Sequence, residues 1–370
     1  MRPVSHYTVT PAPSIMVRVP SATIESTQPG RSRSVHGEKM SIAEPNSTAA
    51  LHTGAILFDG LIVSKWSPKI FDEMGLGGLT AANCTCSVWE NFKQTMDNIA
   101  QWKRWFREHD QRILQVRSVD DIHLAKRQNK TGIILGFQNT SAFEDNIGYV
   151  QLFKELGVRI VQLTYNTQNM VGAGCYESRD GGLSDWGREV LWEMNRVGIL
   201  CDLSHVGSHT SADAVRESKA PVVYSHCLPL ALKSHKRNKS DEELKAVADK
   251  GGLIGVTMFP PFLKNGPKST LADYIEAIDY VVNVVGEDHV GIGTDFTEDY
   301  DDEFFRWITH DKGNARELTK FGEIQNPEGI RRLRDYPNLT QAMNRAGWSS
   351  AKIENILGLN WLALLREVWK

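Results

Sequence analysis

Short apolar segments alternate with longer amphipathic segments over most of the chain, from about residue 55 to residue 300. Continuous or period-two apolar runs predict strands, and runs with apolar positions three and four apart predict helices. The predicted strands are residues 55–61, 79–86, 132–138, 159–165, 199–205, 222–226, 253–258 and 290–296. Predicted helices between them include residues 90–109, 146–156, 186–197 and 271–285.

This alternation predicts an α/β fold. Strands that alternate with helices form a parallel sheet with crossover helices. Eight such repeats favour a closed (β/α)8 TIM barrel over an open sheet. After the last repeat, residues 339–346 and 351–370 predict two closing helices, with Thr340 and either Ser349 or Ser350 as N-caps.

The first 50 residues differ from the rest. They are rich in Ser, Thr, Pro and Arg and have no periodic apolar pattern, so we predict a disordered extension over residues 1–50 and the barrel over residues 51–370. The Arg-rich, acid-poor start also has features of a mitochondrial presequence, and an alternative start at Met40 would remove it.

Bulk properties exclude several classes of protein. A formal net charge of −3 gives no electrostatic case for nucleic acid. The chain has no apolar run long enough to span a membrane. Its five cysteines form no disulfide framework, which favours a reducing compartment. We therefore expect a cytoplasmic location, with mitochondria as the lesser alternative.

The strand ends carry the candidate chemistry, because the C-terminal ends of barrel strands face the active site. Two imidazoles and a carboxylate there are typical of a hydrolytic metal centre, in which the carboxylate takes a proton from the attacking water. The residues at the eight predicted ends are Leu61, Cys86, Gln138, Tyr165, His205, His226, Met258 and Asp295.

Each candidate also has a purely structural interpretation. A single histidine at a strand end is usually structural, but His205 and His226 lie on neighbouring strands and each follows a serine, which favours ligands. Asp295 also suits a turn cap, and Cys86 is more easily explained as a core thiol than as a soft ligand. Arg237, in a basic stretch, either lies in a solvated loop or binds a substrate carboxylate with its guanidinium fork.

Several motifs together resemble the membrane (renal) dipeptidase family, peptidase family M19, over about residues 55–368. The resemblance implies an amidohydrolase-type barrel with two zinc ions, a dipeptide substrate and a tendency to form homodimers. The motifs are Tyr165-Asn166, Gly182-Leu183-Ser184, Gly187-Arg188-Glu189, Asp202-Leu203-Ser204-His205, Ser225-His226, Arg237-Asn238, Gly291-Ile292-Gly293-Thr294-Asp295-Phe296 and Gly358-Leu359-Asn360-Trp361.

The chain departs from the family pattern at the first metal. Leu61 and Val63 occupy the positions of the family's His-x-Asp ligand pair. The bridging Glu of the family corresponds to Gln138, and its substrate-polarising His corresponds to Tyr165. The second metal's histidines, the acid Asp295 and the carboxylate-binding Arg237 are retained. We therefore expect one zinc ion rather than two, or none, at His205, His226 and Gln138.

The resulting expectation is a metal-dependent hydrolase that cleaves the amide bond of a dipeptide or a similar small, carboxylate-bearing substrate. Asp295 and Tyr165 are the expected catalytic residues, with the Tyr165 hydroxyl donating to the oxyanion. Arg237 and Asn166 are the expected substrate-binding residues. The alternatives are a barrel recruited to other chemistry, such as C–N or C–C cleavage, a metal-free binding protein, and a catalytically silent one. We expect small-molecule partners, without nucleic acid or membrane.

Overall fold

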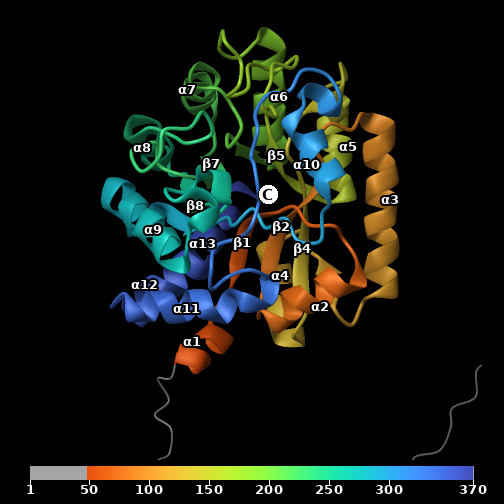
Figure 1. Cartoon of the computed structure of the whole chain (residues 1–370). Helices are drawn as coiled ribbons and strands as arrows, with labels where there is room; N and C mark the ends of the chain where they lie inside the picture. The colour runs from red at the N-terminus through yellow and green to blue at the C-terminus, as the bar shows by residue number, and fades with distance from the viewer. Residues whose placement is uncertain (1–47, 370) are drawn as a thin grey trace, which may run out of the picture. The chain divides into compact units, whose positions relative to one another are not determined.

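The computed structural model describes residues 48–369, and in this range nine parallel strands form one sheet (Figure 1). Eight of them run in the order β1-β2-β4-β5-β6-β7-β8-β9, and β3 pairs with β4 outside this path. The strands are β1 (Phe58–Ile62), β2 (Ala81–Ser87), β3 (Ile113–Gln115), β4 (Thr131–Phe137), β5 (Val158–Gln162), β6 (Leu200–Asp202), β7 (Val222–Cys227), β8 (Leu253–Val256) and β9 (Val290–Ile292).

The sheet closes on itself where β1 meets the segment after β9. The backbone N–H of Asp295 donates to the Leu61 carbonyl at 3.0 Å, and that of Val63 donates to the Phe296 carbonyl at 3.0 Å. Each predicted strand overlaps one barrel strand, so the predicted (β/α)8 barrel is confirmed. Strand β3 was not predicted.

Helices form the outer layer around the strands (Figure 1). They begin at the expected signals: Asn91, for example, caps α3 by accepting from the Gln94 N–H at 3.0 Å. These helices are α2 (Pro68–Leu76), α3 (Phe92–Glu108), α4 (Val119–Gln128), α5 (Gly148–Leu156), α6 (Asp185–Val197), α7 (Ser208–Glu217), α8 (Asp241–Asp249), α9 (Leu271–Val285) and α10 (Asp302–Thr309). Within residues 48–369, no helix has the length and apolar character needed to cross a membrane.

The closing helices pack against one end of the barrel. They are α11 (Tyr336–Arg345), α12 (Ser350–Glu354) and α13 (Asn360–Val368). Trp361 of α13 is fully buried, stacks near Phe58 with ring centroids 5.1 Å apart, and donates its indole N–H to the Ile292 carbonyl at 3.0 Å. This ring therefore ties α13 to both β1 and β9.

The predicted caps of the closing helices had different outcomes. Ser349 caps α12, accepting from the Lys352 N–H at 3.1 Å. The prediction for Thr340 was wrong: α11 begins earlier, at Tyr336, and Thr340 is buried inside it, bonded to His52 of α1 (Thr48–Gly54) at 2.7 Å. The predicted extension, residues 1–50, lies outside the described residues except for its last three, which belong to α1.

Candidate active site

The predicted site residues lie at or just beyond the C-terminal ends of the strands. Strand β6 ends early, at Asp202, because its carboxylate accepts the Ser204 N–H at 3.0 Å and turns the chain. His205 therefore lies in the loop after β6 rather than in the strand. One enclosed pocket, which we call the inner pocket, is lined by Gln138, Tyr165, Asn166, His205, Arg237 and Asp295, among others.

The two predicted histidines contact each other directly. His226 is fully buried in β7, and its Nε2 lies 2.9 Å from Nε2 of His205. The outer nitrogen of each ring is also bonded: Nδ1 of His205 lies 2.7 Å from the Asn166 Oδ1, and Nδ1 of His226 lies 2.7 Å from the Ser225 Oγ. Both imidazoles are thus held at two positions.

Hydrogen bonding assigns the protons of this pair. An amide oxygen only accepts, so His205 donates from Nδ1 to Asn166. The Ser225 hydroxyl donates to the Asp202 Oδ2 at 2.5 Å, and it therefore accepts from Nδ1 of His226. With both Nδ1 atoms acting as donors, the Nε2 lone pairs of the two rings point at each other, which is the arrangement that a cation between them stabilises.

Asp202 positions this pair through hydrogen bonds to Ser204 and Ser225. This role was not predicted from the sequence. The carboxylate is fully buried and also accepts from the Ser204 hydroxyl at 2.6 Å and the Ser225 N–H at 2.9 Å. Burial raises its pKa, and these hydrogen bonds oppose that effect. The available signal was the serine before each histidine, since both serines bind Asp202.

The donor set does not fit two metal ions. Leu61 and Val63 are buried apolar side chains at the end of β1, and among residues 48–369 no three His, Cys, Asp or Glu side chains come together as a metal site. One ion fits the chemistry of the histidine pair, whose Nε2 lone pairs converge. Gln138 donates its amide N–H to the Thr85 Oγ1 at 2.9 Å, which leaves the amide oxygen as its ligand atom.

Asp295 has the electrostatics of an acid–base residue. Burial, which is the largest cause, and the nearby Asp59 raise its pKa to about 7, while Arg237 acts in the opposite direction. A carboxyl group that titrates near neutral pH exchanges protons efficiently there. Its backbone φ of 60° is left-handed, as is the φ of 63° at Asn166. Such strained conformations concentrate at functional sites.

Arg237 is a buried cation without a counter-ion. Its two terminal nitrogens donate to the carbonyls of Ser204 and His226. Its Nε is buried and has no hydrogen-bond partner, and no carboxylate in the described part of the chain lies within ion-pair distance. Burying an unpaired charge is costly, so the pocket is electrostatically suited to an anionic group.

Tyr165 covers the histidine pair. Its ring stacks on His205 with centroids 4.2 Å apart and an interplanar angle of 23°. Burial, more than the neighbouring Asp295, raises the pKa of its hydroxyl. The hydroxyl is therefore protonated at neutral pH and is able to donate a hydrogen bond.

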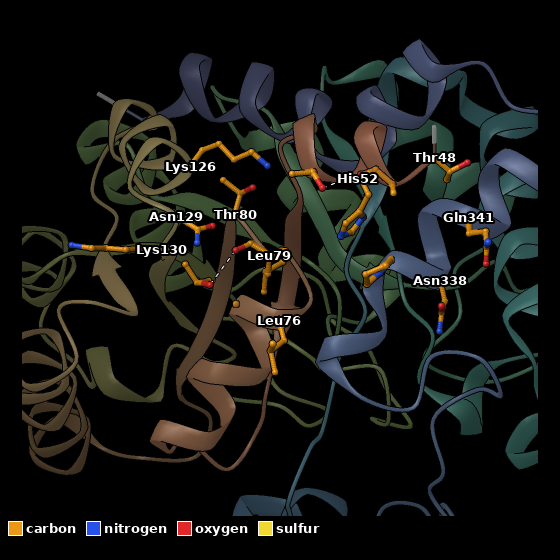
Figure 2. A pocket seen from close by; sticks show the side chains of 16 residues that line it. Thr48, His52, Leu76, Leu79, Thr80, Lys126, Asn129, Lys130, Asn338 and Gln341 are labelled. Carbon is orange, nitrogen blue, oxygen red and sulfur yellow. Dashed lines mark hydrogen bonds between the residues drawn. The ribbon is translucent and has the colours of Figure 1, made fainter. Parts of the chain in front are cut away.

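A cavity of about 670 Å³ lies elsewhere (Figure 2). It is lined by Leu79, Thr80 and Thr131, which precede or begin β2 and β4, so it lies at the opposite end of the strands. Two of its polar groups are committed to the fold: His52 bonds the Gly77 carbonyl at 2.9 Å, and Lys126 donates to the Ala55 carbonyl. We assign no chemistry to it.

The comparison with a curated protein points to dipeptidases. The chain is 29% identical over 286 residues to an uncharacterized dipeptidase of Schizosaccharomyces pombe. The aligned region covers 75% of this chain and 62% of that protein. A dipeptidase of Claviceps purpurea, tcpJ, is 29% identical over 281 residues, or 75% of this chain and 60% of that protein. The chain thus spans about three fifths of the length of these curated relatives.

A solved structure agrees over nearly its whole length. The crystal structure of an amidohydrolase from Pseudomonas aeruginosa is 59% identical, with a TM-score of 0.86 over 87% of this chain and 99% of that one. The model of the membrane dipeptidase family, peptidase family M19, matches residues 66–305. This match covers more than half of the chain and includes both histidines, Arg237 and Asp295. The chain therefore belongs to the membrane dipeptidase family, peptidase family M19.

Proposed function

We propose that this protein is a metal-assisted amidohydrolase that cleaves the amide bond of a dipeptide or a similar small substrate bearing a carboxylate. The observation that carries this proposal is the pair of converging imidazoles, His205 and His226, of which His205 lines the same pocket as Asp295, whose pKa is raised to about 7. Its family is metal-dependent, typically on zinc, and its relatives include named dipeptidases. A cytoplasmic location and a homodimer stay predictions.

In this proposal His205, His226 and the Gln138 oxygen would hold one zinc ion. When bound, such an ion polarises a carbonyl and lowers the pKa of water. Asp295 accepts the proton of the attacking water and returns it to the leaving amine. The Tyr165 hydroxyl donates to the oxygen that becomes negative in the tetrahedral intermediate.

The substrate-binding roles follow from the remaining polar atoms. Arg237 pairs through its unpartnered Nε with the substrate carboxylate. This interaction removes the cost of a buried, uncompensated charge. Asn166 spends its Oδ1 on His205, so its contact with substrate is proposed for the amide nitrogen, which is a donor.

The experiment is hydrolysis of L-alanyl-L-alanine by the purified chain, together with measurement of bound metal. We expect Asp295→Asn to lower kcat by about 100-fold or more with unchanged metal content, while the exposed carboxylate variant Asp288→Asn keeps full activity. Unchanged turnover in Asp295→Asn would reject the mechanism.

One observation favours a second candidate, a metal-free site. The two Nε2 atoms at 2.9 Å are within hydrogen-bond distance, so one proton held between them in place of a metal ion would also satisfy both rings. Burial opposes this proton, because it lowers the pKa of both imidazoles well below the usual value. Full turnover after prolonged dialysis against a chelator, with no metal in the protein, would favour this candidate.

A further inference from the structure

The inner pocket is too small for the proposed substrate. Its free volume is about 20 Å³, which is enough for a single water molecule. Pockets that bind small molecules usually offer about 300 Å³ or more. A substrate with two amino-acid residues therefore needs space beyond the inner pocket.

A second cavity of about 240 Å³, which we call the outer chamber, lies directly beside the inner pocket. The two cavities share Val63, Val88 and Phe304 as lining residues, so these three side chains form the partition between them. Val63 occupies one of the family's metal-ligand positions. In this chain that position is part of an apolar wall.

Phe304 is the part of the partition best placed to move. It lies on α10, and its ring stacks on Tyr300 with centroids 3.4 Å apart. With Val88, Tyr165 and Ile308 it belongs to a small apolar cluster that is separate from the barrel core. Because this cluster is separate from the barrel core, rotation of the Phe304 ring is the change in the partition that requires no movement of a barrel strand.

The outer chamber combines aromatic walls with one carboxylate. Trp66, Trp102, Trp105 and Trp307 line it, as does the half-buried Glu90. The Glu90 oxygens accept from the Val88 N–H at 2.7 Å and the Asn98 amide at 3.3 Å. Both donors are neutral, and within residues 48–369 no Lys, Arg or His forms an ion pair with Glu90. Its charge is uncompensated, and aromatic rings beside a carboxylate favour a cation.

We propose that the outer chamber is a subsite for the ammonium group of the substrate, with Glu90 as its counter-ion and Phe304 as a movable partition. The proposal rests on the proposed function for its other end, where Arg237 takes the carboxylate. The substrate class is then a small zwitterion with an amine and a carboxylate at opposite ends, such as a dipeptide with a free N-terminus.

The experiment is a titration of the full chain followed by tryptophan fluorescence, because four tryptophans line the chamber. The probes are L-alaninamide, a cation without a carboxylate, and N-acetyl-L-alanine, a carboxylate without a cation. We expect Glu90→Gln to weaken binding of L-alaninamide by about tenfold and to change binding of N-acetyl-L-alanine less than about twofold. The control is Glu108→Gln, an exposed carboxylate at the end of α3, which is expected to leave both affinities unchanged.

Three outcomes would overturn the subsite: no saturable binding of L-alaninamide to the wild-type chain, equal L-alaninamide affinity in Glu90→Gln, and equal losses for both probes. Phe304→Ala tests the partition, with Phe305→Ala as its neighbour on α10 that lines neither cavity. We expect only Phe304→Ala to tighten binding of the larger L-phenylalaninamide, and unchanged binding would rule out the gating role.

These titrations do not depend on turnover. A chain that fails to hydrolyse dipeptides but shows the Glu90-dependent loss for L-alaninamide rejects the proposed function and keeps the cation subsite. A chain that hydrolyses dipeptides with no such loss keeps the proposed function and rejects the subsite.

Discussion

Two places at the C-terminal ends of the strands, one at β1 and one at β6 and β7, are held by the same kind of buried carboxylate. The side chains next to the two carboxylates differ. We call these places the β1 end and the β6–β7 end. Asp202, at the end of β6, accepts the Ser204 N–H at 3.0 Å and the Ser225 N–H at 2.9 Å. Asp59, in β1, accepts the Leu61 N–H at 3.0 Å and the Thr294 N–H at 2.9 Å. In both places a buried carboxylate links the N–H two residues ahead to a neighbouring segment, which is β7 for Asp202 and the residues after β9 for Asp59.

The difference lies in the side chains that these carboxylates position. Asp202 binds the residues just before His205 and His226, whereas Asp59 binds the N–H of Leu61, two residues before Val63. The β1 backbone is thus held by the same kind of hydrogen bonds as β6, and the predicted difference from the family pattern at Leu61 and Val63 is confined to side chains. This comparison teaches that metal-binding side chains and the scaffold that aims them are separable.

The largest effect should come from replacing equivalent side chains at the two ends. We expect His205→Ala to abolish metal binding and lower turnover of L-alanyl-L-alanine by more than about 100-fold, beyond the effect typical of outer-shell partners. Leu61→Ala should leave the metal content unchanged and cost about 2–5 kcal/mol of unfolding free energy, because it opens a cavity. Metal analysis, kinetics and denaturant unfolding measure these effects. A His205→Ala protein with normal metal and turnover would make the two ends equivalent.

The supporting carboxylates give the next effect. Asp202→Asn removes the acceptor that fixes Ser225 and hence His226, and we expect metal affinity to fall by about 10- to 100-fold. Asp59→Asn serves as the matched variant. Its new amide N–H would face the donors that now bind the carboxylate, and we expect this to lower the free energy of unfolding by about 1–3 kcal/mol. Metal affinity should not change. Equal losses of metal affinity in both variants would show that the two networks act through the fold alone.

The sequence predicted what depends on local pattern. The pattern of short apolar runs predicted all eight barrel strands. The rule that the C-terminal ends of barrel strands face the active site then indicated His205, His226 and Asp295. The carboxylates Asp59 and Asp202 were missed, because their partners Thr294 and Ser225 are 235 and 23 residues away. The partition residue Phe304 was missed for a similar reason: only packing brings α10 over the ends of the strands.

Asp295 connects the two ends. Its backbone N–H donates to the Leu61 carbonyl, and Arg237, near the histidines, lowers the pKa of its carboxyl group. The charged and titratable groups around it are Arg237, Asp59 and Tyr165. Since a general base acts when ionised, we expect kcat/KM to fall about tenfold per pH unit below its pKa of about 7 and to level off above it. A pH profile that stays flat between pH 5 and about pH 8 would exclude Asp295 as the base.

The same group predicts a smaller effect on stability. Folding raises the pKa of Asp295, so the stability that its neutral form contributes is complete below the unfolded value and is lost as pH rises to about 7. Asp295→Asn stays neutral at all pH values. Its unfolding free energy should therefore exceed that of the wild type at pH 8, by about 4 kcal/mol at most, and match it near pH 4. Denaturant unfolding at both pH values measures the difference.

The smallest expected effect is the restoration of the missing ligands. Because the Asp59 network still aims the end of β1, Leu61→His with Val63→Asp should add a second bound zinc ion per chain. We expect turnover to change by less than about threefold, since Gln138 remains a neutral ligand and Tyr165 remains in place. Metal analysis of the double variant beside each single variant measures this, and the single variants should keep the wild-type count, because one added ligand is too few. A double variant that folds but binds no additional metal would mean that β1 has lost the geometry as well as the ligands, and the two ends would then differ in scaffold too.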